Sequence, residues 1–533
     1  MPTTITLVFG LLVAIVILAT VATRFHLPYA IVLVLGGLIL GFVPGLPTIE
    51  LDPQLLLFLF LPPLIYSSAW FTSWREFRAN VRPIFLLSIG LVLATTALVA
   101  VVAHVLIGLS WPVAFVLGAI VSPTDAVAAS ATAQSAGLSR RLVTVIEGES
   151  MVNDATGLVV YRFAVAVVVS GSFSFAQASF QFALVSLGGL LIGLLVSWPL
   201  AWFHRVMDNA PIEIALTLLT PFAAYLLAEA LDVSGVLAVM AAGLSLSRQS
   251  ARFFSANTRL QANAVWNVLV FLFNGFVFLL IGLQLHHVLE AVTSRDPLVL
   301  LWEALLVCLT VMLVRLLWVL PAAFPTRLFG LLGRYLGERS TQTSWRNVLI
   351  LSWTGMRGGV SLAAALALPL TLAGGKAFPE RDLVLFLTFC VILATLVGQG
   401  LSLGPLIRLL RLPEDGTHER EHAQAHLTAA RAALVRLDEL EGEVWTTEED
   451  LAHLRSVYEN KIQVYLARVD GNAETGNAVN ARPEQTRRLR QEILQAERTS
   501  VIRLRDQKYI DDEVLRVVER ELDLEEQRLL TDW

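Results

Sequence analysis

The chain has 533 residues, of which 56% are hydrophobic and 16% charged, and its mean hydropathy is +0.67. These values exclude an ordinary soluble globular protein and are typical of a chain that lives in lipid. The charges are unevenly distributed: residues 1–411 carry 22 Lys and Arg against 17 Asp and Glu, whereas residues 412–533 carry 17 against 27. We therefore predict a transmembrane domain over 1–411 and a polar helical C-terminal domain over 412–533.

The apolar stretches of residues 1–411 predict an all-α polytopic membrane protein with about thirteen transmembrane helices, since a span needs about 20 apolar residues. The first stretch has no basic n-region and no small-residue cleavage site, so we interpret it as a retained span rather than a signal peptide. The predicted spans are residues 4–23, 28–46, 53–71, 83–107, 112–134, 142–170, 176–203, 212–231, 233–247, 262–288, 298–323, 347–372 and 383–407.

The basic residues between the spans predict the orientation of the chain. Sixteen of them fall on one side, and three (Arg295, Lys376 and Arg381) fall on the other. Because cytoplasmic loops carry an excess of Lys and Arg, we expect a plasma-membrane protein with its N-terminus outside and its C-terminal domain in the cytoplasm. Cys308 and Cys390 both fall within spans, so no disulfide is expected.

Two of the predicted spans contain residues that interrupt a helix. The fifth span has Ser122-Pro123-Thr124-Asp125 at its middle, and proline removes a backbone donor and disfavours helix in the preceding residue. The twelfth span has Gly355-Met356-Arg357-Gly358-Gly359, whose glycines permit unwinding. If the chain consists of two inverted six-helix repeats joined by the seventh span, these are the fifth helices of the two halves. Paired interruptions of this kind point to the substrate site of a transporter.

Gly and Pro are also common in membrane helices for packing alone. Here, however, each interruption coincides with a charged residue, Asp125 in one and Arg357 in the other, and charges within spans are rarely kept without a function. Half-helix ends carry partial charges. Asp125 is therefore expected to neutralise exposed helix N-termini, and Arg357 the C-termini.

The sixth span contains two carboxylates, at Glu149 and Asp154. On a helix Glu149 and Asn153 share one face, while Ser150 and Asp154 share the adjoining one. The second pair is an all-oxygen arrangement that suits a hard cation or a proton. We expect Glu149 to form a buried ion pair with Arg357, which leaves Asp154 free to titrate. The alternative is a polar patch that holds helices together.

Five other charged residues lie within spans, and we expect them to reach the interface or to pair structurally. They are Arg162, Glu213, Glu229, Glu303 and Arg315.

The chain resembles the sodium/proton exchanger branch of the monovalent cation/proton antiporters. The resemblance covers residues 1–411 and is carried by six motifs in the order of the family. They are Leu61-Pro62-Pro63, Ser122-Pro123-Thr124-Asp125, Glu147-Gly148-Glu149-Ser150 with Asn153-Asp154, Ser234-Gly235-Val236-Leu237-Ala238, Phe278-Leu279-Leu280-Ile281-Gly282-Leu283-Gln284 and Gly355-Met356-Arg357-Gly358-Gly359.

The resemblance implies a homodimer in which a six-helix core domain moves against a dimerisation domain, and one site that Na⁺ and H⁺ occupy in turn. It implies that Asp154 is the ion- and proton-binding carboxylate, with Ser150 and Thr124 as further Na⁺ ligands. Asn153 matches the asparagine that marks electroneutral exchangers, and Glu149 and Arg357 match a structural ion pair. Ser67 departs from the pattern, because some relatives have Asp or Glu at its position. Whether Na⁺, Li⁺ or K⁺ is preferred stays open.

Two other functions use some of these residues. A passive cation channel needs a continuous pore lined by carbonyls or charges, whereas a single titratable Asp beside broken helices suits an occluded site. A membrane enzyme would use Asp125 and Asp154 as a carboxylate pair and would leave Asn153 and Arg357 without a role. The sequence has no phosphate-binding loop, zinc-ligand spacing or nucleotide fingerprint. We therefore expect no enzyme activity, cofactor, ATP coupling or nucleic-acid partner.

The C-terminal domain is predicted to contain four polar helices, over residues 418–444, 447–469, 484–508 and 511–531. Thr446 and Glu449 have the spacing of a capping box at the start of the second. The last carries apolar residues at the spacing of a narrow helix-packing seam, namely Leu515, Val518, Leu522 and Leu529. These helices either form a bundle that assists dimerisation or regulate transport.

Overall fold

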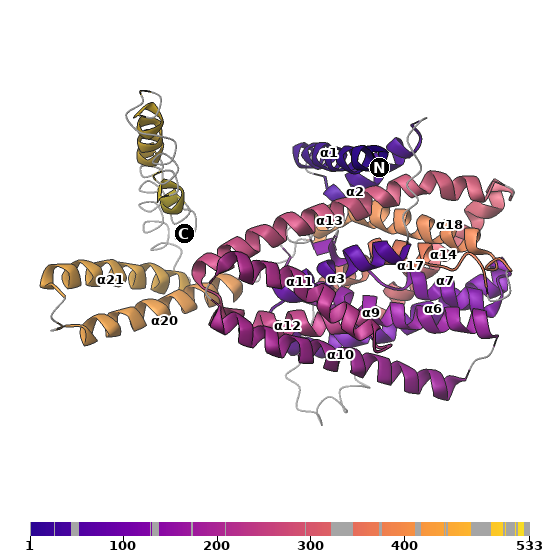
Figure 1. The fold of residues 1–533 in the computed structure, drawn as a ribbon, viewed down its shortest axis with the longest axis horizontal. Helices are drawn as coiled ribbons and strands as arrows, with labels where there is room; N and C mark the ends of the chain where they lie inside the picture. Colours follow the sequence, from indigo (N-terminus) through magenta and orange to yellow (C-terminus); the bar gives the residue numbers. More distant parts are fainter. Residues whose placement is uncertain are drawn as a thin grey trace. The chain divides into compact units, whose positions relative to one another are not determined.

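The computed structural model consists of helices, in two compact units that comprise Met1–Glu414 and Asp415–Trp533 (Figure 1). Each unit is described by itself. The structure describes residues 2–25, 27–43, 53–127, 129–130, 138–171, 174–207, 209–293, 295–320, 345–372, 376–410, 417–441, 443, 446–470, 492–504, 507, 518 and 521–526.

In the first unit the chain forms a succession of helices, most of them apolar. They are α1 (Pro2–Arg24), α2 (Tyr29–Gly41), α3 (Pro53–Phe71), α4 (Trp74–Ala79), α5 (Val81–Phe85), α6 (Val92–Val102), α7 (Trp111–Val121), α9 (Arg140–Ser170), α10 (Phe175–Val206), α11 (Ala210–Glu229), α12 (Gly235–Phe253), α13 (Ala256–Ala291), α14 (Pro297–Val319), α16 (Trp345–Trp353), α17 (Gly359–Leu366), α18 (Arg381–Leu393) and α19 (Gly400–Leu410). The π-helical segments Leu86–Leu91, Ala103–Ile107 and Ala394–Gln399 continue their neighbours without a break.

Each of the thirteen predicted spans contains a helix. Within the described residues, eight helices are long and apolar enough to cross a membrane, and three shorter apolar helices accompany them. The longest, α13, begins at Ala256, whereas the hydropathy pattern predicts a start at residue 262. The difference arises because Ser255 caps the helix by accepting a hydrogen bond from the Thr258 backbone N–H at 3.2 Å. The number of crossings and the inverted repeat stay predictions.

Small residues let helices of this unit approach one another closely. A Cβ placed on Gly37 of α2 would overlap the backbone of Leu279 in α13, and one placed on Gly282 of α13 would overlap the backbone of Val34 in α2. Close backbone contact through small residues is the usual means by which helices pack within membranes. Accordingly, α2 runs along α13 in Figure 1.

The structure confirms both predicted interruptions. Helix α7 ends at Val121, and residues 122–125 are non-helical; α16 ends at Trp353, and residues 354–358 separate it from α17. The two non-helical segments meet, because the backbone N–H of Asp125 donates to the Met356 carbonyl at 2.7 Å. Backbone groups that a break leaves without helical partners thus bond across the crossing.

The second unit contains an antiparallel hairpin of α20 (Thr417–Glu439) and α21 (Glu448–Asp470). Arg455 of α21 bonds to Asp438 of α20 at 2.6 Å. The predicted capping box is wrong by one residue: the Thr447 hydroxyl, not that of Thr446, accepts a hydrogen bond from the Asp450 N–H at 3.2 Å. Helix ends depend on such local competition between neighbouring hydroxyls.

Residues 492–504 and 521–526 are also helical. Of the predicted seam, Leu522 is buried and packs against Leu494 and Val518, while Leu515 and Leu529 lie outside the described residues.

Candidate functional site

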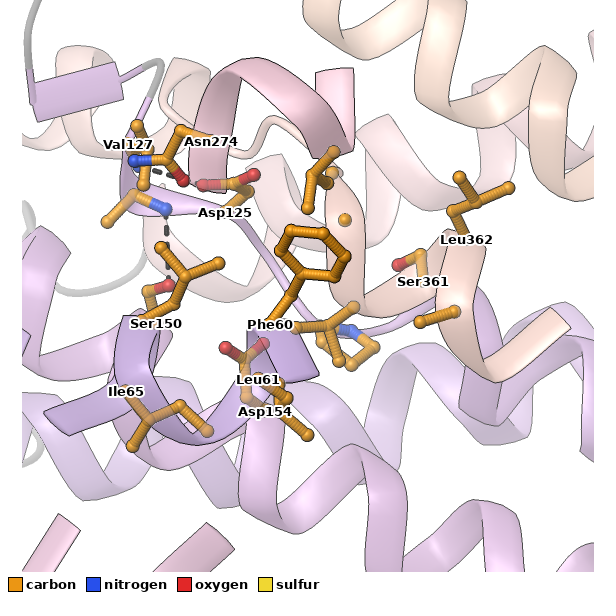
Figure 2. Close-up of a pocket in the computed structure, with 18 of the residues that line it drawn as sticks. Phe60, Leu61, Ile65, Asp125, Val127, Ser150, Asp154, Asn274, Ser361 and Leu362 are labelled. Atoms are coloured by element: carbon orange, nitrogen blue, oxygen red, sulfur yellow. Dashed lines mark hydrogen bonds between the residues drawn. The ribbon is translucent and has the colours of Figure 1, made fainter. Parts of the chain in front are cut away.

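A cavity of about 120 Å³ lies where the crossing of the broken helices meets α3, α9 and α13. It is large enough for several waters, since one water needs roughly 10–15 Å³ of such space. Four of the predicted site residues line it: Thr124 and Asp125 from the first broken helix, and Ser150 and Asp154 from α9. Figure 2 shows Asp154 near Phe60 and Leu61, with Asp125 and Asn274 on the other side of the cavity.

Asp154 is a carboxylate of the cavity that has no cationic partner among the described residues. Its side chain is half-buried on the cavity-facing side of α9. Within the part of the chain that the structure describes, no cationic side chain lies within ion-pair distance of it, and none donates a hydrogen bond to it. The Ser150 hydroxyl, one turn earlier, accepts a hydrogen bond from the backbone N–H of Ala126 at 3.1 Å. This bond ties α9 to the segment that follows the break in α7.

Glu149 is not among the residues that line the cavity, and its side chain is buried. Its partner is Arg315 of α14, which bonds to both carboxylate oxygens, with Nη2 at 2.9 Å from Oε2. Both side chains are 1% exposed. A buried pair with two bonds satisfies each charge by the other. The Arg315 guanidinium also donates to the Leu351 carbonyl at 3.0 and 3.2 Å.

The expected direct pair between Glu149 and Arg357 is therefore corrected. Arg357 instead donates from Nε to the Val121 carbonyl at 3.1 Å and from Nη1 to the Gly355 carbonyl. The physical reason is the break itself. Carbonyls at the end of α7 lose their helical partners, and a buried guanidinium satisfies them. Arg315, expected only to reach the interface or to pair structurally, lies on a continuous helix and has its guanidinium available for Glu149.

The Asp125 side chain lies next to the N-terminal end of α17, although it belongs to the segment after α7. Its Oδ1 accepts a hydrogen bond from the Val127 N–H at 2.8 Å. Gly358 is in such close contact that an added Cβ would overlap the Asp125 carboxylate. An acidic group at the N-terminal end of a helix is favourably placed, because the exposed N–H groups carry partial positive charge.

Asn153 lies behind the cavity rather than in its lining. Its amide nitrogen donates to the Thr124 hydroxyl at 2.7 Å, and that hydroxyl donates to Glu149 Oε1 at 3.2 Å. A chain of hydrogen bonds thus runs from Arg315 through Glu149 and Thr124 to Asn153. The Thr124 hydroxyl is held in one orientation by partners on both sides.

One amide of the cavity wall belongs to none of the predicted site residues. Asn274 of α13 is 4% exposed, lines the cavity and lies next to Asp125 in Figure 2. Its signal was a single amide within an apolar run, one turn before the Phe278–Gln284 motif. Ser67 also lines the cavity, and its hydroxyl donates to the Leu64 carbonyl of its own helix at 2.8 Å. No carboxylate therefore reaches the cavity from this position.

The contact between Gly358 and Asp125 leads to a prediction. Gly358→Ala should lower thermal stability by the equivalent of about 1–3 kcal/mol, the usual cost of overpacking, because Asp125 must move. The matched control is Gly398→Ala, where an added Cβ meets no atom within 4 Å. Melting curves of both variants in detergent measure the difference, and equal melting temperatures would contradict the close contact.

Comparison with known proteins gives the family. The family model described as "Sodium/hydrogen exchanger, transmembrane" matches residues 10–409. The chain belongs to this family. An uncharacterized Na⁺/H⁺ exchanger of Mycobacterium tuberculosis is 38% identical over 98% of this chain and 97% of the relative, and one of Escherichia coli is 34% identical over 97% of each.

The fold agrees with this assignment. The solved structure of the sodium proton antiporter MjNhaP1 from Methanocaldococcus jannaschii matches with a TM-score of 0.59 and 19% identity, over 77% of this chain and 100% of that chain. The exchanger is thus a secondary transporter rather than an enzyme, and its family does not favour a passive channel. It is a multi-pass membrane protein.

Proposed function

We propose that this exchanger moves Na⁺ and H⁺ in opposite directions across the plasma membrane, and that both ions bind in turn to Asp154. The proposal rests on a difference between two carboxylates of the site, Asp154 and Glu149. Asp154 faces the cavity without a cationic partner among the described residues, whereas Glu149 is bonded to Arg315. Buried charges are costly unless neutralised, so a carboxylate that faces a cavity with room for several waters is suited to a mobile cation or a proton. The physiological role is pH and sodium homeostasis.

Ser150 and Thr124 are the proposed neutral ligands of Na⁺. Hard cations prefer oxygen ligands, and both residues line the cavity with Asp154. Each hydroxyl is oriented by an existing bond, Ser150 by the Ala126 N–H and Thr124 by Asn153 and Glu149. Asn153 therefore acts by positioning Thr124.

Li⁺ and K⁺ are the competing cations to test beside Na⁺. A relative from Bacillus subtilis, 35% identical over 73% of this chain, is described as a sodium, potassium, lithium and rubidium/H⁺ antiporter.

The proposed transport cycle is alternating access of the elevator type within a homodimer. The ion ligands belong to α9 and the broken helices, while α3 and α13 supply a mostly apolar wall that includes Phe60, Leu61 and Val277. Ser67 and Asn274 are polar residues of the same wall. Sliding of the ion-carrying group along an apolar wall would expose the cavity to each side in turn. We further propose that the N-terminus faces outward and that the C-terminal domain is cytoplasmic.

The test is exchange in proteoliposomes that contain the purified protein and a pH-sensitive dye. An outward gradient of Na⁺ should acidify the lumen as protons enter in exchange for departing Na⁺, and the same gradient of Li⁺ or K⁺ reports cation preference. Cation flux that persists without any counter-flow of protons would contradict the proposal and indicate a channel.

Electroneutral 1:1 exchange is a separate prediction. The site holds three carboxylates (Glu149, Asp125 and Asp154) and two guanidinium groups (Arg315 and Arg357), so one Na⁺ or one H⁺ gives the same net charge. A membrane potential contributes about 2.3 kcal/mol per net charge per 100 mV, and here no net charge moves. Exchange should therefore have the same rate with and without a potassium potential set by valinomycin. Acceleration by the potential would show that a second group carries charge, and Asp125 would be the first residue to replace.

A further inference from the structure

Two histidines of the C-terminal unit lie side by side on one face of α20. His422 and His426 are four residues apart, both side chains are exposed, and their ring centres are 4.4 Å apart with ring planes inclined by 52°. On α21, Tyr465 stacks on His426 with ring centres 4.8 Å apart and planes 10° apart. The helical hairpin therefore holds the His426 ring beside that of His422.

We propose that His422 and His426 bind a divalent transition metal ion such as Zn²⁺, Ni²⁺ or Cu²⁺. Histidines at positions i and i+4 share a helix face and chelate Zn²⁺ in helical metal sites, and imidazole suits all three ions. Metal–nitrogen bonds of about 2.0–2.1 Å place two imidazoles on one ion with ring centres roughly 4.5–5 Å apart. The separation in α20 is close to that value. Na⁺, a hard cation, prefers oxygen ligands and is not expected here.

The same helix offers a competing pair. His418 stands one turn before His422 in α20. Residues 418 and 426 are separated by about 12 Å along the helix axis at 1.5 Å per residue, so one ion cannot bind all three histidines. His422 would belong to either pair. The stacking of Tyr465 on His426 favours the pair of His422 and His426, because it orders one ligand before the ion arrives.

Binding at this pair would stabilise the beginning of α20. The ion would join two successive turns, and the first turns of a helix are the costly ones to form. Helix α20 begins at Thr417, a few residues after α19 ends at Leu410. The proposed metal site therefore lies close in sequence to the end of the transmembrane domain. It is separate from the Na⁺ site and does not depend on the proposed transport function.

The experiment is a calorimetric titration of ZnCl₂ into the full-length protein in detergent, purified with a tag that lacks histidine and freed of metal by a chelator. We expect one Zn²⁺ per chain, with affinity reduced at least tenfold in His422→Ala and in His426→Ala. The matched control is His453→Ala, which removes an exposed histidine from α21 and should bind like the wild type. Cu²⁺ bound to the wild type should show two nitrogen ligands in its electron paramagnetic resonance spectrum.

Two results would overturn the proposal. Wild-type affinity in both His422→Ala and His426→Ala would show that the pair does not bind the ion. Loss of binding in His422→Ala with wild-type affinity in His426→Ala would assign the ion to His418 and His422 instead. The melting temperature of each variant in metal-free buffer serves as the check that the protein is folded, and it should equal that of the wild type.

Discussion

Asp154→Asn should reduce Na⁺/H⁺ exchange to the level of liposomes without protein. Asparagine has nearly the shape of aspartate, but it neither releases a proton nor offers a negative charge to Na⁺. The cavity keeps its size and its neutral oxygens, so only the titrating charge is removed. Stability should be unchanged or higher, because a buried carboxylate without a cationic partner costs free energy that a neutral amide does not. Dye-reported exchange and a melting curve on the same preparation measure both effects.

The matched control for this variant is Asp232→Asn. It makes the same chemical change at an exposed residue outside the cavity lining. Asp232 has a φ of 55°, and asparagine tolerates that left-handed conformation. Exchange by Asp232→Asn should equal that of the wild type. Wild-type exchange by Asp154→Asn would remove Asp154 from the mechanism, and a large loss of stability in that variant would make it a structural residue.

The parts of the site that follow from local chemistry could be predicted from the sequence. Pro123 and the glycines on either side of Met356 interrupt their helices through their own backbone properties, so both breaks were expected where the structure has them. Ser150 and Asp154 share a helix face because their spacing is four. Both residues line the cavity, together with Thr124 and Asp125.

The partner of Glu149 could not be predicted in the same way. The sequence offers three arginines within spans. Arg162 lies on the same span as Glu149, and either of the other two, Arg315 and Arg357, can neutralise that carboxylate. The choice depends on which carbonyls the crossing leaves without partners, and that is a property of the assembled helices. Arg357 bonds to carbonyls beside the breaks, so Arg315, 166 residues away in the chain, pairs with Glu149. Asn274 was missed for a related reason, since a single amide within an apolar run does not show which residues of other helices it will lie beside.

The pair of Glu149 and Arg315 should contribute strongly to stability. Glu149→Gln leaves the Arg315 charge buried without its partner. Arg315→Met likewise leaves the Glu149 charge buried without its partner. Loss of one partner of a buried pair typically costs about 3–5 kcal/mol. The double variant removes both charges and should be less destabilised than the sum of the two single variants. Melting temperatures of the four proteins in detergent complete the cycle.

Two further double-mutant cycles serve as controls for the coupling between Glu149 and Arg315. Arg162 and Glu229 also form an ion pair at 2.6 Å, but their side chains are 50% and 32% exposed. Solvent screens such pairs, so their coupling should be only about 0.2–1 kcal/mol. A cycle of Glu149→Gln with Arg357→Met should likewise show less coupling than the cycle with Arg315→Met, because the Arg357 guanidinium bonds to carbonyls rather than to Glu149. A larger coupling energy of Glu149 with Arg357 than with Arg315 would contradict the ion pair seen in the structure. It would support the pair of Glu149 and Arg357 that the motifs predict.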